Sequence, residues 1–216
     1  YNRALFRSKT SVLNSEEINI LSEENYNQTL NMGNGIMGSI EIPKISVNLP
    51  IYHGTWDEIL SAGVGHVNGS SLPIGGSSRK SILTGHRGLP SSKLFTRLDE
   101  LELNDLFFIS VLNETLAYKV VNIQVIEPED VSSLEIEEGR DLVSLITCTP
   151  YGVNTHRLVV TGERTIYEKS VYEGINKNSM SMREVIFTII PFGFVTIVIG
   201  MKLKERKEKK NGCKEN

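Results

Sequence analysis

Short, β-branched runs separated by turns rich in glycine and proline recur through the first three quarters of the chain. Runs of this kind are typical of β-strands. They cover residues 35–42, 45–51, 81–84, 106–112, 115–126, 142–147 and 158–161. Strands this short and this closely spaced favour a closed or nearly closed barrel. The stretch from Gly35 to Tyr167, about 130 residues, is long enough for one sizeable core, so the sequence predicts a single mainly β domain.

Helical character is confined to three stretches of the sequence. These are residues 3–6 and beyond, 16–31 and 56–62. The third stretch begins after Thr55, which we expect to be its N-cap, and Glu58 three residues later would complete a capping box. The helices are therefore expected to be short additions to the barrel.

Seventeen residues without a charge, from Val185 to Met201, form the longest apolar run. This length is at the lower limit of about 17 to 25 residues for a membrane-spanning helix, and the alternative is a buried C-terminal core helix. Six lysines and arginines follow within residues 202–210. By the positive-inside rule we expect a transmembrane helix with a cytoplasmic tail and an extracellular domain before it. Because the chain begins at Tyr1 without a signal peptide, we expect an N-terminal targeting piece to have been trimmed.

Charge is distributed unevenly along the chain. Residues 202–216 carry a net charge of +4, which leaves −7 on residues 1–201 from the whole-chain value of −3. An acidic domain argues against nucleic acid as a partner, because binding to phosphates requires a basic surface. Anionic lipid headgroups are sufficient to explain the basic tail.

Cys148 is the only cysteine in the first two hundred residues, and it ends a β-branched run before a Pro-Tyr-Gly-Val-Asn loop. The other cysteine, Cys213, follows the expected membrane segment, so no disulfide within the chain is expected. A single thiol in an exported domain either forms a disulfide with another chain or is a reactive group. Its position at a strand end, facing a loop, makes Cys148 a candidate nucleophile.

A cysteine nucleophile needs a nearby base or cation, because a free thiol has a pKa of about 8.5. The histidines available are His53, His66, His86 and His156. His86 follows a β-branched strand and lies between two glycines, as expected for a side chain held at a barrel rim. Arg157 begins the strand after the Cys148 loop and would return beside the thiol, where its N–H groups could stabilise a carbonyl oxygen that gains negative charge. A thiol, an imidazole and a guanidinium together are sufficient for acyl transfer.

Several motifs resemble those of one enzyme family, the sortases. Residues 144–148, Ser-Leu-Ile-Thr-Cys, resemble the Thr-Leu-x-Thr-Cys signature, residues 83–88 resemble the histidine motif, and residues 154–158 resemble the arginine strand. The longer stretches at 50–55, 65–76 and 148–158 are similar to class C, the pilus-assembling sortases of Gram-positive bacteria. The resemblance extends from Gly35 to Tyr167.

This resemblance implies a mainly β fold, a closed eight-stranded sortase barrel with short helices and a C-terminal transmembrane helix. It implies His86 as general acid and base, Cys148 as nucleophile and Arg157 as oxyanion stabiliser. The expected segments are an N-terminal helical, lid-like segment at 1–34, the catalytic barrel at 35–170, a linker at 171–184, the membrane helix at 185–203 and the tail at 204–216. The implied partners are the cell membrane and pilin subunits with Leu-Pro-x-Thr-Gly-like signals and acceptor lysines. We expect no cofactor and no metal, because no paired His or Cys occurs at ligand spacing.

Two features depart from the family pattern. Ser144 replaces the usual threonine, which should not affect the chemistry because both residues carry a hydroxyl. Pilus sortases commonly cover the thiol with a lid that has an Asp-Pro-aromatic anchor, and residues 9–26 contain no proline and no aromatic residue before Tyr26. Without this anchor we expect an open or disordered segment that leaves the thiol accessible, and the alternative is that Ile18, Ile20 or Leu21 plugs the groove instead.

Two alternatives to a pilus-assembling enzyme remain. A membrane-anchored binding module would need a Leu-Pro-x-Thr-Gly signal just before Val185, and residues 174–184 contain nothing similar. A housekeeping-type sortase that attaches proteins to cell-wall peptide would use the same three residues.

Overall fold

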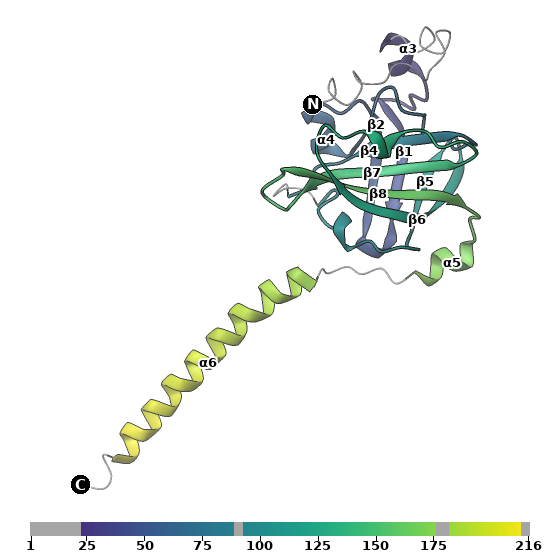
Figure 1. Cartoon of the computed structure of the whole chain (residues 1–216). Coiled ribbons are helices and arrows are strands. Elements are labelled where there is room, and N and C mark those ends of the chain that lie inside the picture. The colour runs from purple at the N-terminus through teal and green to yellow at the C-terminus, as the bar shows by residue number, and fades with distance from the viewer. Residues whose placement is uncertain (1–22, 89–92, 176–181, 213–216) are drawn as a thin grey trace. The chain divides into compact units, whose positions relative to one another are not determined.

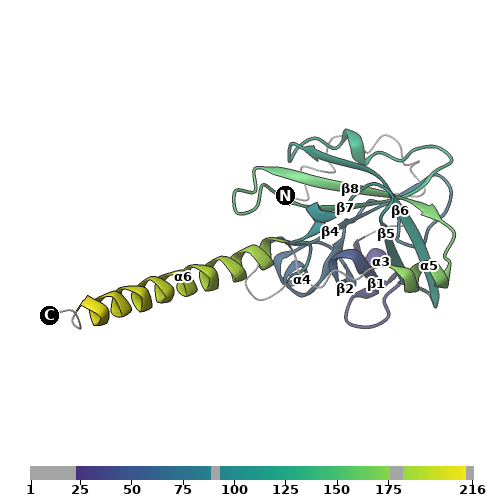
Figure 2. The ribbon, with the colours of Figure 1, turned by 90° about the horizontal axis from the view of Figure 1, so that it is seen from below.

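The computed structural model describes residues 23–88, 93–175 and 182–212. Within these residues eight strands form a closed barrel in the order β1-β2-β3-β4-β7-β8-β6-β5, seen from two directions in Figures 1 and 2. The strands are β1 (Ile36–Ile42), β2 (Val47–His53), β3 (Val64–His66), β4 (Arg79–Thr84), β5 (Leu106–Val111), β6 (Glu114–Ile126), β7 (Asp141–Thr149) and β8 (His156–Thr165). The predicted mainly β, closed eight-stranded barrel is confirmed.

Most neighbouring strands of the barrel are antiparallel, but β2–β3 and β4–β7 are parallel pairs. Strands β5 and β6 form a hairpin whose turn is Leu112-Asn113, both with positive φ. Positive φ at both central residues is the conformation that matches the twist of a two-residue hairpin. The sequence did not predict β3, because its three residues include Gly65 and make too short a run to stand out.

Side chains alternate between two apolar clusters on opposite faces of the β4–β7–β8 sheet. The main core fills the barrel and includes Leu83, Leu145 and Leu158. A second cluster contains Ile146 and Val159 together with Val67, Ile82 and Leu134. Since successive residues of a strand point to opposite faces, the second cluster lies on the outer face, where Leu134 of the β6–β7 connection covers it.

The helices of the barrel unit are short. Helix α3 (Glu23–Gln28) occupies part of the predicted helical stretch at 16–31, and α4 is Asp57–Ala62. The predicted capping box at Thr55 is wrong, because Trp56 is the N-cap of α4 and makes no side-chain capping bond. Residues 1–22, which hold the first predicted helix and most of the lid-like segment, lie outside the described residues.

Residues that were predicted as the start of a linker form a helix. Helix α5 (Lys169–Gly174) packs on the barrel, where Tyr172 and Tyr167 make edge-to-face contacts with Phe108 of β5. The Tyr172 hydroxyl also donates a hydrogen bond to the Glu41 carboxylate at 2.9 Å. Because the Tyr172 ring packs on Phe108, residues beyond the predicted boundary at residue 170 contact the barrel.

The second unit of the chain contains helix α6 (Met182–Gly212), which includes the apolar run and Pro191. Across the described ranges of the chain, no helix combines the length and the apolar character needed to cross a membrane. The predicted transmembrane helix at 185–203 is therefore not supported. A helical run of seventeen residues is only about 26 Å long, against a hydrocarbon core of about 30 Å, and it is followed at once by Lys202.

Candidate active site

Cys148 and Arg157 are direct neighbours across two antiparallel strands. Cys148 is the last residue but one of β7, Arg157 is the second residue of β8, and the two are partners in the strand register. The chain turns between them through residues 150–155, so both side chains are at the same end of the barrel. The strand register therefore places Arg157 beside Cys148, as the sequence predicted.

His86 continues β4 beside the end of β7. Thr84 is the last registered partner of β4 and pairs with Ile146 in parallel. The alignment extends one residue further, because Gly85 N–H donates to the Ile146 carbonyl at 3.1 Å and the Thr147 hydroxyl donates to the Gly85 carbonyl at 2.8 Å. A side chain at Gly85 would collide with the Phe95 ring, with its Cβ 2.8 Å from the nearest ring atom. His86 and Cys148 are the residues that follow Gly85 and Thr147 on the two segments.

The three predicted site residues therefore form one row on the outer face of the barrel. Residues paired across strands share a face, so Arg157 and Cys148 lie on the face of Val159 and Ile146. Continued alternation from Thr84 puts His86 on that face as well. The second apolar cluster forms the floor next to the row, and the barrel core lies on the other side of the sheet.

The electrostatics of the row suit a thiol that must be activated. Cys148 is half-buried and unpaired, and burial raises the pKa of its thiol, while the positive charge of Arg87 lowers it. Burial also lowers the pKa of the Arg157 guanidinium, which as an arginine stays protonated at neutral pH. Arg157 Nη1 donates to the backbone carbonyls of Asn154 at 3.0 Å and His156 at 2.8 Å, which orients the side chain.

His86 keeps access to solvent and has an acidic neighbour. Its side chain is 32% exposed, and its Nε2 lies 4.0 Å from Oδ1 of Asp57, the first residue of α4. At this distance the contact is an ion pair only when the imidazole is protonated. An imidazole with access to solvent can take a proton from a neighbouring thiol and deliver it to a leaving group.

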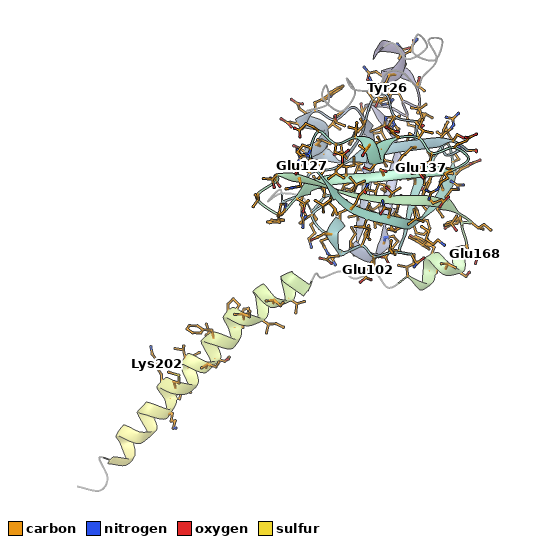
Figure 3. All side chains as sticks on the ribbon, viewed as in Figure 1. Tyr26, Glu102, Glu127, Glu137, Glu168 and Lys202 are labelled. Atoms are coloured by element: carbon orange, nitrogen blue, oxygen red, sulfur yellow. The ribbon has the colours of Figure 1, made fainter. Side chains whose placement is uncertain are left out.

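The structure separates the other histidines from the row. His66 is fully buried, and its Nδ1 accepts a hydrogen bond from the Tyr26 hydroxyl at 2.8 Å, while its Nε2 lies 2.9 Å from the Ser71 carbonyl. The Tyr26 hydroxyl also accepts the Gly54 N–H at 3.1 Å, so α3 is attached to β2 and β3 through this side chain, labelled in Figure 3. His53 is buried beside the same tyrosine ring, at 5.0 Å between centroids.

His156 lies next to the row without belonging to it. Its Nε2 is 3.1 Å from Oε1 of Glu127, the residue after β6 that Figure 3 labels, and its Nδ1 is 2.8 Å from the Thr155 hydroxyl. In the register His156 pairs with Thr149, which alternation places on the face opposite Cys148. Among the described histidines, His86 is the one that directly follows the parallel pairing of β4 with β7, the strand that carries Cys148.

Stability should decrease as His66 becomes protonated. Burial lowers its pKa from 6.5 to about 4, and positive charge on His53 acts in the same direction. Below pH 6.5 the unfolded chain binds a proton at His66 that the folded chain does not bind until about pH 4. We expect about 3 kcal/mol of unfolding free energy to be lost across this window. Urea unfolding at pH 7 and at pH 4 gives the unfolding free energy at each pH. Between the two pH values this free energy should decrease less for His66→Gln than for the unmodified protein. An equal decrease in the two proteins would show that His66 is not the group responsible.

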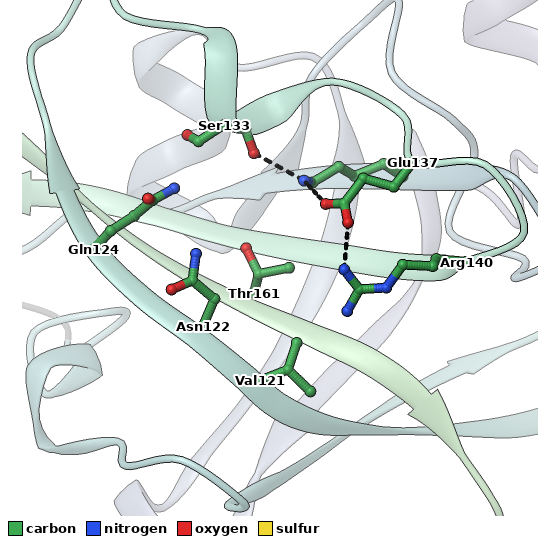
Figure 4. Close-up of a pocket in the computed structure, with 8 residues that line it drawn as sticks. Val121, Asn122, Gln124, Ser133, Glu137, Arg140 and Thr161 are labelled. Atoms are coloured by element: carbon green, nitrogen blue, oxygen red, sulfur yellow. Dashed lines mark hydrogen bonds and ion pairs between the residues drawn. The ribbon is translucent and has the colours of Figure 1, made fainter.

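A polar pocket of about 310 Å³ lies further along the same outer face (Figure 4). The buried Lys80 donates to the Ser133 carbonyl at 2.8 Å and to Glu137 at 3.3 Å, and Glu137 also pairs with Arg140. This network attaches the β6–β7 connection to β4. Thr161 lines the pocket and pairs with Ser144, four residues before Cys148, so the pocket does not include the row.

Across the described residues no three His, Cys, Asp or Glu side chains gather so that they could hold a metal.

Fold and site together define a class of protein. A closed barrel that carries a thiol, an imidazole and a guanidinium in register on three neighbouring chain segments has the components of a cysteine acyl-transfer enzyme. Residues 40–165, more than half of the chain, match the sortase domain. The chain therefore belongs to the sortase family, whose members are cysteine transpeptidases.

Known relatives specify the branch of the family that the chain resembles. Sortase D of Bacillus subtilis (strain 168) is 31% identical over 130 residues, which are 59% of this chain and 63% of the relative, so the match spans less than two thirds of its length. The crystal structure of sortase C-1 from Actinomyces oris is 50% identical and has a TM-score of 0.66, with 67% of this chain and 82% of that chain covered. Sortase C2 of Pilus Island 1 from Group B Streptococcus is 47% identical with a TM-score of 0.61, covering 62% and 76%. The predicted resemblance to class C sortases is confirmed.

Proposed function

We propose that this protein is a pilus-assembling transpeptidase that uses Cys148, His86 and Arg157. It would cleave a Leu-Pro-x-Thr-Gly-like signal on a pilin between threonine and glycine, and join the threonine to a lysine amine of the next pilin. The observation that carries this proposal is the register of β7 with β8, which pairs Cys148 with Arg157, and it is supported by the pairing of β4 with β7, which ends two residues before His86 and Cys148. The class C neighbours support the choice of pilins as substrates.

The first half of the reaction forms a thioester. The Cys148 sulfur, after losing its proton to His86, attacks the threonine carbonyl carbon, and the carbonyl oxygen becomes an oxyanion next to Arg157. The carbon–nitrogen bond to glycine then breaks, and His86 gives its proton to the departing amine. Because one imidazole both accepts and donates the proton, it must lie within reach of the thiol and of the departing amine.

The second half transfers the acyl group to an amine. A lysine amine of the next pilin attacks the thioester carbon, His86 accepts the amine proton, and the carbon–sulfur bond breaks to return the thiolate. Transfer to an amine in the presence of water requires the acceptor to be positioned, since good alignment is worth about 7 to 11 kcal/mol of the barrier. Pilins are surface proteins, so the catalytic domain would work on the outer side of the cell.

An alternative acceptor is the amine of cell-wall peptide, as in a housekeeping-type sortase. This alternative is favoured by residues 9–26, which lack the Asp-Pro-aromatic anchor common in pilus sortases. The deciding experiment offers the protein a pilin with its sorting signal together with an excess of a short cell-wall peptide amine. A ladder of covalently linked pilins supports pilus assembly. If the products carry only the cell-wall peptide, the proposed pilus assembly is wrong and the protein anchors its substrates to the cell wall.

Replacement of Arg157 by lysine should reduce transfer nearly as much as replacement by alanine. A single ammonium cannot reproduce the planar fork that donates to an oxyanion and to the carbonyls of Asn154 and His156 at once. Loss of one oxyanion donor typically reduces kcat about a hundredfold to a thousandfold. Arg164→Lys on the same strand, whose guanidinium lies over the Tyr118 ring, is the matched control. Retention of most activity in Arg157→Lys would show that the residue is only a structural cation.

A further inference from the structure

Arg87, the residue after His86, is buried at the junction of the segments that carry the site. Its side chain is 3% exposed, and its Nη2 lies 2.7 Å from Oδ2 of Asp99 in the 3-10 helix Leu98–Glu100. Its Nη1 donates to the hydroxyl of Thr149, the residue after Cys148, at 3.4 Å. Its guanidinium carbon lies 5.5 Å from the centre of the Tyr151 ring, which belongs to the turn between β7 and β8.

These contacts connect three parts of the site. Arg87 belongs to the segment that carries His86. Its guanidinium contacts Thr149 at the end of β7 and the Tyr151 ring in the turn that leads to Arg157. The same ring packs against Gly88, where an added Cβ would lie 3.2 Å from it, and Gly88 has a φ of +79°. A side chain at that position would be strained by the positive φ and would press against the Tyr151 ring. The geometry therefore fixes both the cation and the turn relative to the thiol.

Several charged groups of the described residues belong to the segments around Cys148. From the β4 side they are His86 and Arg87, from the start of β8 they are Arg157 and His156, and from the surrounding segments they are Asp57, Asp99 and Glu127. His156 is paired with Glu127 and lies on the opposite face, whereas the charge of Arg87 acts on the thiol and lowers its pKa against the effect of burial. Asp99, as the counter-charge of Arg87, weakens that effect.

We propose that Arg87 is a positioning residue of the active site, whose fixed positive charge favours the Cys148 thiolate and whose contacts hold the turn between Cys148 and Arg157. The part that concerns the turn rests on the proposed function. The part that concerns the thiol does not, because thiol reactivity can be measured without any pilin. Arg87 thereby supplies a permanent charge that His86 provides only when protonated.

The experiment measures the pH dependence of Cys148 alkylation by iodoacetamide in the full chain. The reagent is neutral, so a change in protein charge does not alter its approach, and mass spectrometry of the Cys148 peptide separates it from Cys213. For Arg87→Gln we expect the rate at pH 7 to fall about threefold to tenfold and the midpoint of the profile to move to higher pH. For Asp99→Asn we expect the opposite direction, a faster reaction and a lower midpoint, because the Arg87 charge is no longer compensated.

Two further variants separate charge from packing. Arg87→Lys keeps the charge and should keep the alkylation profile, yet it should slow pilin joining because the fork to Thr149 and Asp99 is lost. Arg97→Gln removes a buried arginine paired with Glu100 in the same region and should leave the alkylation profile unchanged. An unchanged profile in Arg87→Gln, or shifts in the same direction for Arg87→Gln and Asp99→Asn, would overturn the proposal. If Arg87→Gln does not fold, the opposite shift in Asp99→Asn still decides it.

Discussion

Replacement of Cys148 by alanine should abolish pilin joining and leave the barrel folded. The carbon–sulfur bond of the thioester has no substitute in alanine, so no acyl intermediate can form and no residual transfer is expected. The loss of one half-buried sulfur at a strand end removes little packing, because the barrel core lies on the opposite face of β7. Joining is measured by the appearance of covalent pilin ladders, and folding by circular dichroism and the urea midpoint.

The matched control for Cys148→Ala is Cys213→Ala, which removes the other thiol of the chain. It should retain the rate of the unmodified protein. Ladders formed at the normal rate by Cys148→Ala would refute the nucleophile assignment, and equal losses in both variants would point to a role for cysteines in assembly rather than in chemistry.

Replacement of His86 by alanine should reduce transfer by about 10² to 10⁴, the usual contribution of a general acid–base group. The same imidazole serves the thiol, the leaving glycine amine and the incoming lysine amine, so both halves of the reaction should slow. The backbone at this position is held by the hydrogen bonds of Gly85 and by Phe95 N–H, which donates to the His86 carbonyl at 3.0 Å. The variant should therefore fold normally, and single-turnover thioester formation should be slow as well.

His66→Gln is the comparison for His86→Ala. It removes a buried imidazole that is bonded to Tyr26, away from the row, so its effect should be on stability and not on the rate of the folded enzyme. A folded His66→Gln that loses as much activity as His86→Ala would require the base to be reassigned.

The sequence was sufficient to place the thiol and the guanidinium beside each other. A strand that ends at Cys148, a short loop and a strand that begins near Arg157 can only return antiparallel, so the pairing follows from local pattern. The proximity of His86 to Cys148 could not be derived in this way, because the parallel pairing of β4 with β7 joins residues far apart in the chain. The resemblance to a family supplied that part.

Other features were missed because their signals are tertiary. Arg87 could be read from the sequence only as a neighbour of a candidate histidine, since Asp99 and Tyr151, which give it a role, approach through folding. Helix α5 has no distinctive pattern and is held by aromatic contacts with Phe108. The expected cap at Thr55 failed because the chain begins α4 one residue later, after Trp56.

The parallel pairing of β4 with β7 also has a consequence for folding, if His86 and Cys148 act together as proposed. Thr84 and Ile146, the last pair before His86 and Cys148, are 62 residues apart in the sequence. Contacts across so long a loop carry a large closure entropy and tend to form late, whereas the β5–β6 hairpin can form locally. A partly folded chain therefore holds a thiol without its imidazole partner. Under the proposed mechanism, acyl transfer would require a closed barrel, and an incompletely folded molecule would not be expected to acylate itself or a neighbouring chain.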